Sequence, residues 1–328
     1  MPSIETSWPL AEPVAAQTVR LVPIVTRPLA IRRHFLAALG GSMLLLALLL
    51  DMADLRIDFW QPSSIAYGAA AALLLVLRFG LPRSGWRHAG TVAPFATYVG
   101  LFTLISVMGA AASYPVAALT HGYADATLQR IDAALGFDWL HWYRLTASHR
   151  GLQFLETAAY RSIYVTPALL LWCMARAGEQ ERAWRFIATF WLAAVITLIL
   201  FSLMPAVGPF SYLWHEPIRY MPESELWQQG LIPALRTHAV HAIDLGQLRG
   251  IVSAPSFHTA AAVLYIAAGW RIAALRWPIV ALNAAMLLST PVEGTHYLID
   301  MILGLGVALT ALALMDIHRR RCAVSDQA

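Results

Sequence analysis

Eight long apolar runs constrain the fold of this chain more than any other feature. They cover residues 34–51, 62–81, 91–118, 151–176, 183–204, 256–275, 278–290 and 297–316. Most of them reach the roughly 20 residues that a helix needs to cross the hydrocarbon core of a bilayer. The run at 278–290 is the shortest, so it must borrow flanking residues from 271–277 or lie where the membrane is thin. The sequence therefore predicts an all-α, polytopic membrane bundle with one transmembrane helix for each run.

Composition supports the same class of protein. Of 328 residues, 59% are hydrophobic and 13% are charged, whereas an ordinary soluble domain has about 25% charged residues. The two cysteines are too few for a disulfide scaffold. The basic residues follow the predicted topology and form no basic stripe on a soluble domain, so no nucleic-acid partner is expected.

The distribution of arginine predicts the orientation of the bundle. The chain has no lysine, and fifteen of its 23 arginines fall on one side of the predicted topology. Cytoplasmic loops of membrane proteins carry an excess of basic residues, so this side is expected to be cytoplasmic. Both termini then lie in the cytoplasm, residues 1–33 as an arm rather than a cleavable signal and residues 317–328 as a tail. We expect an integral protein of a bacterial inner membrane.

The chain divides further at two long segments on the opposite, extracytoplasmic side. Residues 119–150 mix charges with aromatics, which is typical of helices in the membrane interface but also of an ordinary connection. Residues 205–254 are rich in proline, tryptophan, histidine and glutamate, and a loop of this length favours a lid or a substrate entrance. Residues 34–118 then form three N-terminal transmembrane helices, and residues 151–316 form the membrane core.

Ionisable residues gather at two membrane boundaries on this extracytoplasmic side. His258 lies at the start of the sixth run, and His296 and Asp300 lie at the start of the eighth. The chain crosses the membrane and returns between them, so the topology predicts that His258 and His296 meet. A spacing of four places His296 and Asp300 on one helix face, where the carboxylate fixes the tautomer of the imidazole. Any one of these residues is also compatible with a polar group satisfied by a neighbouring helix, but three together favour a functional site.

Two histidines and an aspartate are sufficient for phosphoryl transfer. One imidazole attacks phosphorus as a covalent nucleophile, and the second protonates the departing alkoxide. This chemistry requires neither a metal nor a cofactor. The same residues also match a two-histidine, one-carboxylate zinc site, but the chain has no His-Glu-x-x-His segment, and phosphoryl transfer explains the spacing better.

The segments around these residues resemble a known family. Residues 255–258, Pro-Ser-Phe-His, are similar to the Pro-Ser-x-His motif of the type 2 phosphatidic acid phosphatase superfamily. Residues 289–300 are similar to its Ser-Arg-x5-His-x3-Asp motif. The resemblance implies that His296 is the nucleophile and forms a phosphohistidine, that Asp300 orients it, and that His258 is the general acid.

The resemblance covers about residues 151–316 and has two departures. The superfamily's phosphate-binding lysine has no counterpart in a chain without lysine, and Thr290 stands where the second motif has arginine. Both departures favour a divergent branch that includes the inositol phosphorylceramide synthases. The turn at 204–209 is also similar to that branch, although its prolines are equally typical of a plain helix stop.

Other residues must then contact the phosphate. The candidates for substrate binding are Arg161, Arg249, Ser256, Thr290 and Glu293. The planar fork of arginine suits phosphate oxygens, and Arg161 is costly inside a span unless it is paired or faces a polar cavity. The alternative for Arg161 is a structural pair with Glu156 or another acid, and Glu293 either pairs with an arginine or orients an acceptor hydroxyl.

The expected function is cleavage of a lipid phosphate or phospholipid at the outer face of the membrane. The close alternative is transfer of the phosphoryl headgroup to an alcohol acceptor, as the resemblance to inositol phosphorylceramide synthases implies. A lipid scrambler or transporter predicts internal symmetry, which the sequence lacks. A catalytically inactive membrane scaffold is the remaining alternative, which the missing lysine and arginine keep open.

Overall fold

Long helices dominate the architecture. The computed structural model describes residues 27–228 and 230–325, so most of the expected N-terminal arm lies outside the described residues. The helices are α1 (Arg27–Met52), α2 (Pro62–Gly80), α3 (Ala89–Leu119), α4 (Asp125–Ala134), α5 (Trp139–Ser148), α6 (Arg150–Arg161), α7 (Thr166–Arg176), α8 (Gln180–Leu203), α9 (Pro209–Leu213), α10 (Glu225–Gln228), α11 (Leu231–Arg236), α12 (Phe257–Gly269), α13 (Arg276–Glu293) and α14 (Leu298–Ser325). Two short 3₁₀ turns, η1 (Leu81–Arg83) and η2 (Ser162–Tyr164), and two short strands, β1 (Arg56–Ile57) and β2 (Ala242–Ile243), accompany them.

Helices occupy most of each of the eight apolar runs, although α12 ends at Gly269 within the run 256–275, and the protein is an all-α membrane bundle that is 74% helical. Five helices, α1, α2, α3, α8 and α14, are long and apolar enough to cross a membrane. The shortest predicted run begins at Arg276 in α13, so it does borrow flanking residues. The run at 151–176 is not one straight helix, because η2 interrupts it between α6 and α7. Pro167, at the start of α7, has no N–H to continue the helical hydrogen bonding across this point.

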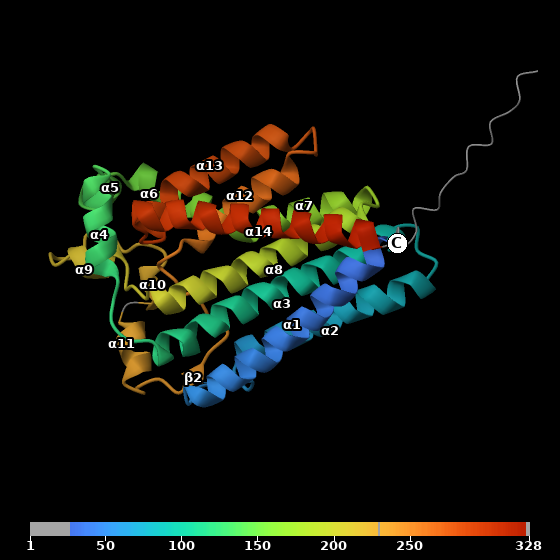
Figure 1. Ribbon diagram of the computed structural model, residues 1–328, viewed down its shortest axis with the longest axis horizontal. Coiled ribbons are helices and arrows are strands. Elements are labelled where there is room, and N and C mark those ends of the chain that lie inside the picture. The colour runs from blue at the N-terminus through green and yellow to red at the C-terminus, as the bar shows by residue number, and fades with distance from the viewer. Residues whose placement is uncertain (1–26, 229, 326–328) are drawn as a thin grey trace, which may run out of the picture.

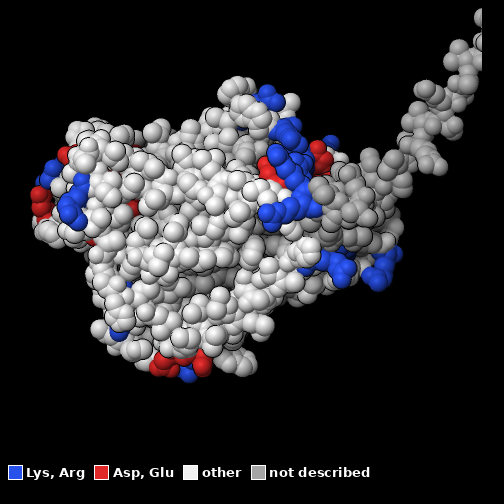
Figure 2. Space-filling view, viewed as in Figure 1, with Lys and Arg blue, Asp and Glu red and all other residues white. Residues whose placement is uncertain are grey.

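The long helices run side by side, and five short ones gather at one end of the bundle (Figure 1). We call this end the loop end; it is formed by α4, α5, α9, α10 and α11. The described part of α14 ends at the opposite end. On the face shown in Figure 2, charged side chains lie towards the two ends and a broad uncharged band separates them. This band is the surface expected of helices that face lipid.

Both long segments of the predicted extracytoplasmic side contain regular structure. Residues 119–150 form α4 and α5, so they are helical rather than an irregular connection, while their position in the membrane interface stays a prediction. Residues 205–254 contain α9, α10, α11 and β2. Strand β2 pairs in parallel with β1, and this pair fastens the long segment to the turn between α1 and α2.

Small residues allow α12 and α14 to approach closely. Ala260 and Ala261 of α12 and Ala308 of α14 are fully buried in the main core. At Gly304, a Cβ atom would lie only 2.2 Å from the carbonyl oxygen of Ser256, at the start of α12. The backbones of α12 and α14 are therefore in near contact at the loop end, where both helices begin.

Candidate active site

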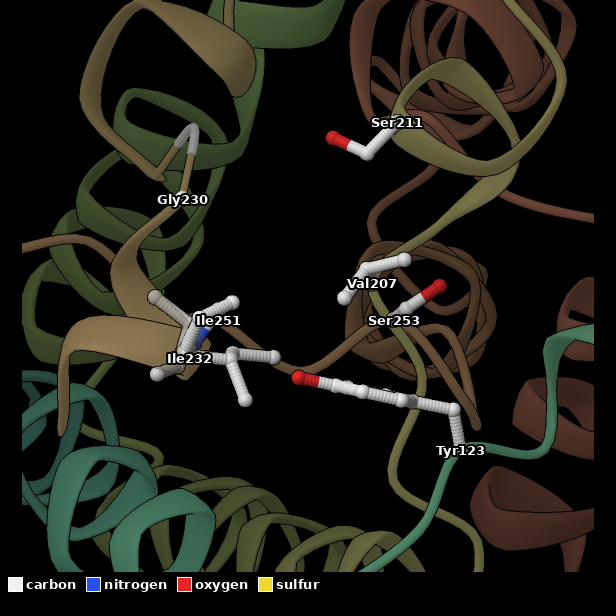
Figure 3. Close-up of a pocket in the computed structure, with 8 residues that line it drawn as sticks. Tyr123, Val207, Ser211, Gly230, Ile232, Ile251 and Ser253 are labelled. Carbon is white, nitrogen blue, oxygen red and sulfur yellow. The ribbon is translucent and has the colours of Figure 1, made fainter. Parts of the chain in front are cut away.

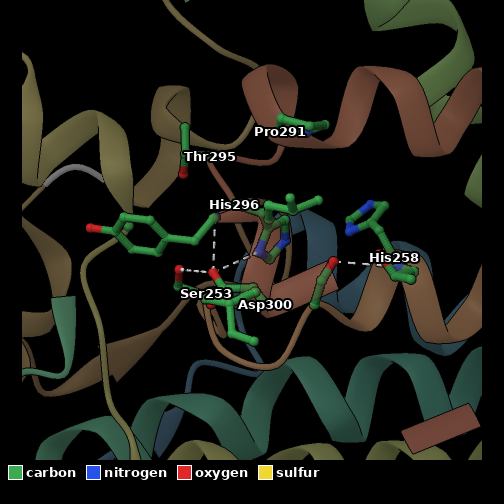
Figure 4. A network of polar contacts seen from close by, with 12 residues as sticks. Ser253, His258, Pro291, Thr295, His296 and Asp300 are labelled. Atoms are coloured by element: carbon green, nitrogen blue, oxygen red, sulfur yellow. Dashed lines mark hydrogen bonds and ion pairs between the residues drawn. The ribbon is translucent and has the colours of Figure 1, made fainter. Parts of the chain in front are cut away.

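The two histidines expected to meet lie next to each other at the loop end. His258 is the second residue of α12, and His296 lies in the turn between α13 and α14. Their ring centroids are 6.4 Å apart and their planes are inclined by 56°. Asp300, in the first turn of α14, lies on the side of His296 that faces away from His258 (Figure 4). The three residues therefore form one cluster in the order His258, His296, Asp300.

The contact between His296 and Asp300 is made differently from the expectation. Nδ1 of His296 lies 3.6 Å from Oδ2 of Asp300, an ion-pair distance that is longer than a hydrogen bond. His296 precedes α14, so the two residues do not share a helix face. Instead, Thr295 has a positive φ of 48°, and the N–H of His296 donates to the carbonyl of Pro291. This tight turn directs Nδ1 towards the carboxylate and leaves Nε2 as the nitrogen able to attack.

The carboxylate of Asp300 is fully buried, and two donors contact one of its oxygens. Its Oδ2 accepts hydrogen bonds from the N–H of Tyr297 at 3.1 Å and from the hydroxyl of Ser253 at 3.2 Å. The carbonyl of Asp300 accepts from the N–H of Ser256, which caps α12. Buried charges are tolerated when they are hydrogen-bonded in this way. Asp300 thus links the starts of both helices, and Ser253 is a site residue that the sequence motifs do not include.

His258 packs against Tyr160, a buried residue at the end of α6. The two rings are stacked, with centroids 4.0 Å apart and planes inclined by 17°. The phenolic oxygen of Tyr160 lies 3.3 Å from Nδ1 of His258. Nε2 of His258 is buried and has no hydrogen-bond partner among the described residues. Buried polar atoms are nearly always paired, so this nitrogen is a natural contact for a bound substrate.

Two buried aspartates of α4 hold the segments around the cluster. Asp125 accepts hydrogen bonds from the N–H groups of Val207 and Gly208 and from the hydroxyl of Tyr297. Asp132 accepts from the first two N–H groups of α14, at 2.7 and 2.9 Å. Burial raises the pKa of both carboxyls, and the hydrogen bonds oppose this shift in part. Sequence reasoning missed both residues; their spacing of seven, which places them on one helix face, is the signal that would have found them.

The turn at 204–209 contacts the segment that carries His296 as well as ending α8. Gly208 has a φ of 92°, and a Cβ atom there would lie 2.9 Å from the carbonyl oxygen of Thr295. Its N–H and that of Val207 are the groups that Asp125 holds. The turn is therefore packed directly against the residue that precedes His296.

A loop segment just before α10 covers the end of α13. The carboxylate of Glu293 accepts hydrogen bonds from the hydroxyl of Tyr220 and from the N–H of Glu223. The hydroxyl of Thr295 donates to the buried carboxylate of Glu225 at 3.2 Å. The long segment 205–254 is therefore fastened to the residues on either side of the turn that carries His296.

The two arginine candidates have different partners, and only Arg161 contacts this loop. Arg161 forms a two-pronged ion pair with Glu223, with N–O distances of 3.0 and 2.7 Å, and its side chain is 57% exposed. Arg161 therefore pairs with an acid, as the alternative interpretation predicted, and that acid is Glu223. Glu156, the other predicted partner, instead accepts a hydrogen bond from the hydroxyl of Thr146. Arg249 donates to the carbonyl of Leu248. Their contacts with phosphate stay predictions.

The two hydroxyl candidates are fully buried and already engaged within their own helices. Ser256 caps α12 by accepting from the N–H of Thr259, and Thr290 donates to the carbonyl of Met286 in α13. Thr290 has committed its O–H to Met286, whereas Ser256 only accepts and so keeps an O–H that a phosphate oxygen requires. Their role in substrate binding is therefore also a prediction that the hydrogen bonds do not address.

A pocket of about 350 Å³ lies beside the cluster, between the turn at 204–209 and α11 (Figure 3). Ser253 lines it and also donates to Asp300, so the pocket and the cluster share a wall. The hydroxyl groups of Ser211 and Tyr123 point into it, and Ile232 and Ile251 supply apolar surface. No charged side chain of the described residues lines this pocket.

Comparisons with known proteins place this cluster in a family. Within the described part of the chain, no group of three or more His, Cys, Asp or Glu side chains is placed to hold a metal ion. No curated protein and no solved structure matches the chain significantly. The family model of the PAP2 superfamily matches residues 126–314, which is more than half of the chain and includes His258, His296 and Asp300. The chain therefore belongs to the PAP2 superfamily, whose members are phosphoesterases and phosphotransferases.

Proposed function

We propose that this protein is a membrane-bound lipid phosphate phosphatase that acts through a phosphohistidine on His296. The observation that carries the proposal is the order of the three side chains, with the His296 ring between Asp300 and His258. A nucleophile needs an orienting partner on one ring nitrogen and a free path to the other. A general acid must face the same reacting atoms. In the cluster, Asp300 lies beside Nδ1 of His296 as the orienting partner, and His258 lies beside the same ring as the general acid.

The proposed reaction has two balanced steps. In the first, Nε2 of His296 attacks phosphorus, the bond to the lipid oxygen breaks, and His258 gives its proton to that oxygen. In the second, a water attacks the phosphohistidine, returns a proton to His258 and releases inorganic phosphate with free His296. Asp300 stabilises the positive charge that develops on His296 in the first step. Its burial strengthens this interaction because little water screens it.

Phosphate charge must also be neutralised at the site. We assign this role to Arg161 and Arg249, with Ser256, Thr290 and Glu293 shaping the surroundings. Arg161 already binds a carboxylate with both prongs of its guanidinium, which is the geometry that a phosphate also accepts. A substrate phosphate would therefore compete with Glu223 for Arg161.

The active site is proposed to lie on the extracytoplasmic side of a bacterial inner membrane. Arginine dominates the ends of the helices opposite the loop end, at positions such as Arg83, Arg176, Arg185, Arg276 and Arg320. The excess of basic residues on cytoplasmic surfaces then directs the loop end outward. The substrate would be a lipid phosphate or phospholipid of the outer leaflet.

Headgroup transfer to an alcohol acceptor is the second candidate, as in an inositol phosphorylceramide synthase-like enzyme. The pocket beside the cluster favours it, because its wall carries hydroxyl groups and lacks charge among the described residues. Such a lining suits an uncharged hydroxylated molecule better than a second phosphate. The two candidates use the same histidines and differ only in whether water or the alcohol attacks the phosphohistidine.

The decisive experiment offers lipid phosphates and diphosphates to purified protein in detergent with EDTA, with and without glycerol and myo-inositol. The His296→Ala variant is the test, and His88→Ala, at the opposite end of the bundle, is the matched control. Inorganic phosphate released by wild type and His88→Ala, but not by His296→Ala, supports the phosphatase. Product formed only with an alcohol supports the transferase. Full activity of His296→Ala would refute both candidates.

A further inference from the structure

Tyr160 belongs to neither sequence motif, yet it makes the closest ring contact with His258. Its side chain is only 8% exposed, at the end of α6. Its ring lies flat on the imidazole, and its hydroxyl reaches Nδ1. Resting on the function proposed above, we propose that Tyr160 is a positioning residue that fixes the tautomer of His258, so that the imidazole carries its proton on Nε2.

The hydrogen-bond inventory of the pair supports this direction. A neutral imidazole has one N–H and one bare nitrogen, whereas a phenol both donates and accepts. If Nδ1 carried the proton and donated to Tyr160, the buried O–H of Tyr160 would have no acceptor among the described residues. If Tyr160 donates to a bare Nδ1, both groups are satisfied at 3.3 Å. The proton of His258 then resides on Nε2, the nitrogen without a protein partner in the described residues.

The packing around Tyr160 leaves its ring little freedom. A Cβ atom at Gly294 would lie 3.1 Å from Cε2 of Tyr160 and 2.7 Å from Cδ2 of His296. Tyr160 is therefore wedged between His258 and the turn that carries His296. The ring of Tyr160 thus sets the angle of His258 relative to His296. The absence of a side chain at Gly294 leaves space for that ring.

This tautomer is the one that the two-step reaction requires. In the first step the N–H at Nε2 gives its proton to the lipid oxygen as the bond to phosphorus breaks. In the second step the bare Nε2 takes a proton from the attacking water, which restores the starting state. Throughout both steps Tyr160 keeps its own proton and donates to Nδ1. The opposite tautomer would present a bare nitrogen to the leaving group and could not protonate it.

The test uses Tyr160→Phe, which keeps the stacked ring and removes the hydroxyl, with Tyr164→Phe in the neighbouring η2 as the matched control. Phosphatidic acid, whose alkoxide needs a proton, is compared with p-nitrophenyl phosphate, whose phenolate does not. General acids contribute about 10²–10⁴-fold, so kcat of Tyr160→Phe should fall about 10- to 100-fold with phosphatidic acid and less than about threefold with p-nitrophenyl phosphate. Tyr164→Phe should match wild type on both substrates.

A spectroscopic measurement checks the tautomer without relying on turnover. In protein labelled with ¹⁵N-histidine, the resonance that disappears in His258→Asn identifies His258. Its ¹⁵N shifts should report a protonated Nε2 in wild type and a mixed tautomer in Tyr160→Phe.

Three results would overturn the proposal. Tyr160→Phe could lose kcat equally on both substrates, it could lose kcat on neither, or the wild-type spectrum could report a protonated Nδ1. None of these results would rescue or refute the role of His296, which the His296→Ala experiment decides separately.

Discussion

Substitution of Gly304 by alanine tests how closely the site depends on the packing of α14 against α12. A Cβ atom at this position would lie 2.2 Å from the carbonyl oxygen of Ser256 and 3.0 Å from Cβ of Thr259. Both neighbours belong to the first turn of α12, which also carries His258. The new methyl group would therefore push against the backbone that positions His258, the proposed general acid.

The size of the effect follows from these distances. A relaxed contact between carbon and a carbonyl oxygen is about 3.3 Å, so the helices must separate by about 1 Å to admit the methyl group. Overpacking of this kind costs about 1–3 kcal/mol of the free energy of unfolding. A misplacement of about 1 Å at catalytic groups lowers the rate by about 10²-fold. We therefore expect Gly304→Ala to lose stability and most of its kcat together.

Gly306, on the same helix, is the matched control because a Cβ atom there has no neighbour within 4 Å. Gly306→Ala should gain about 0.5–1 kcal/mol, since alanine is the better helix former, and should keep wild-type kcat. The assays are the thermal unfolding midpoint in detergent and kcat with phosphatidic acid. If Gly304→Ala has the same unfolding midpoint and the same kcat as Gly306→Ala, the close approach of α12 and α14 does not position the site.

Four further outcomes follow from the site. Asp300→Asn should lower kcat by about 10³-fold while the protein stays folded, because the amide no longer stabilises a positively charged His296, and an unchanged kcat would contradict this role. His258→Ala should lose about 10²–10⁴-fold with phosphatidic acid and far less with p-nitrophenyl phosphate, and equal losses would remove its role as general acid. Asp132→Ala should lower the free energy of unfolding by about 2–4 kcal/mol, measured by chemical denaturation, because two N–H groups of α14 lose their acceptor. Burial raises the pKa of the carboxyls of Asp125 and Asp132, so the folded protein retains protons that the unfolded chain releases. Stability should therefore rise as the pH falls from neutral towards the ordinary aspartate value of 3.8, which should raise the unfolding midpoint of wild type relative to Asp132→Asn, and the opposite trend would refute the shift.

Much of the fold was predictable because lipid imposes a simple rule on sequence. Each of the eight apolar runs is mostly helical, since an unpaired backbone group that faces hydrocarbon is too costly for an irregular structure. The interruption at η2 was not predicted, because the apolar pattern continues through Ser162–Tyr164 and only Pro167 marks the break. Periodicity reports which residues face lipid, but it does not report where one helix bends.

The cluster itself was predictable from topology, while its supporting contacts were not. His258 and His296 meet because two helices start at the same end of the bundle, which the order of the runs already implies. The turn at Thr295, which places His296 before α14, depends on local backbone conformation that the helical spacing concealed. The ion pair of Arg161 with Glu223 joins residues 62 positions apart, and no pattern within one segment indicates such a partner.

The carboxylate that closes the start of α14 belongs to Asp132, 166 residues earlier in the chain. The first turn of α14 is therefore completed only when α4, which is made much earlier, packs against it. His296 lies two residues before that turn, so the same packing fixes the backbone that leads into it. A chain in which α4 has not yet met α14 would hold both histidines without this anchored turn, so under the proposed function the site would become active only on assembly.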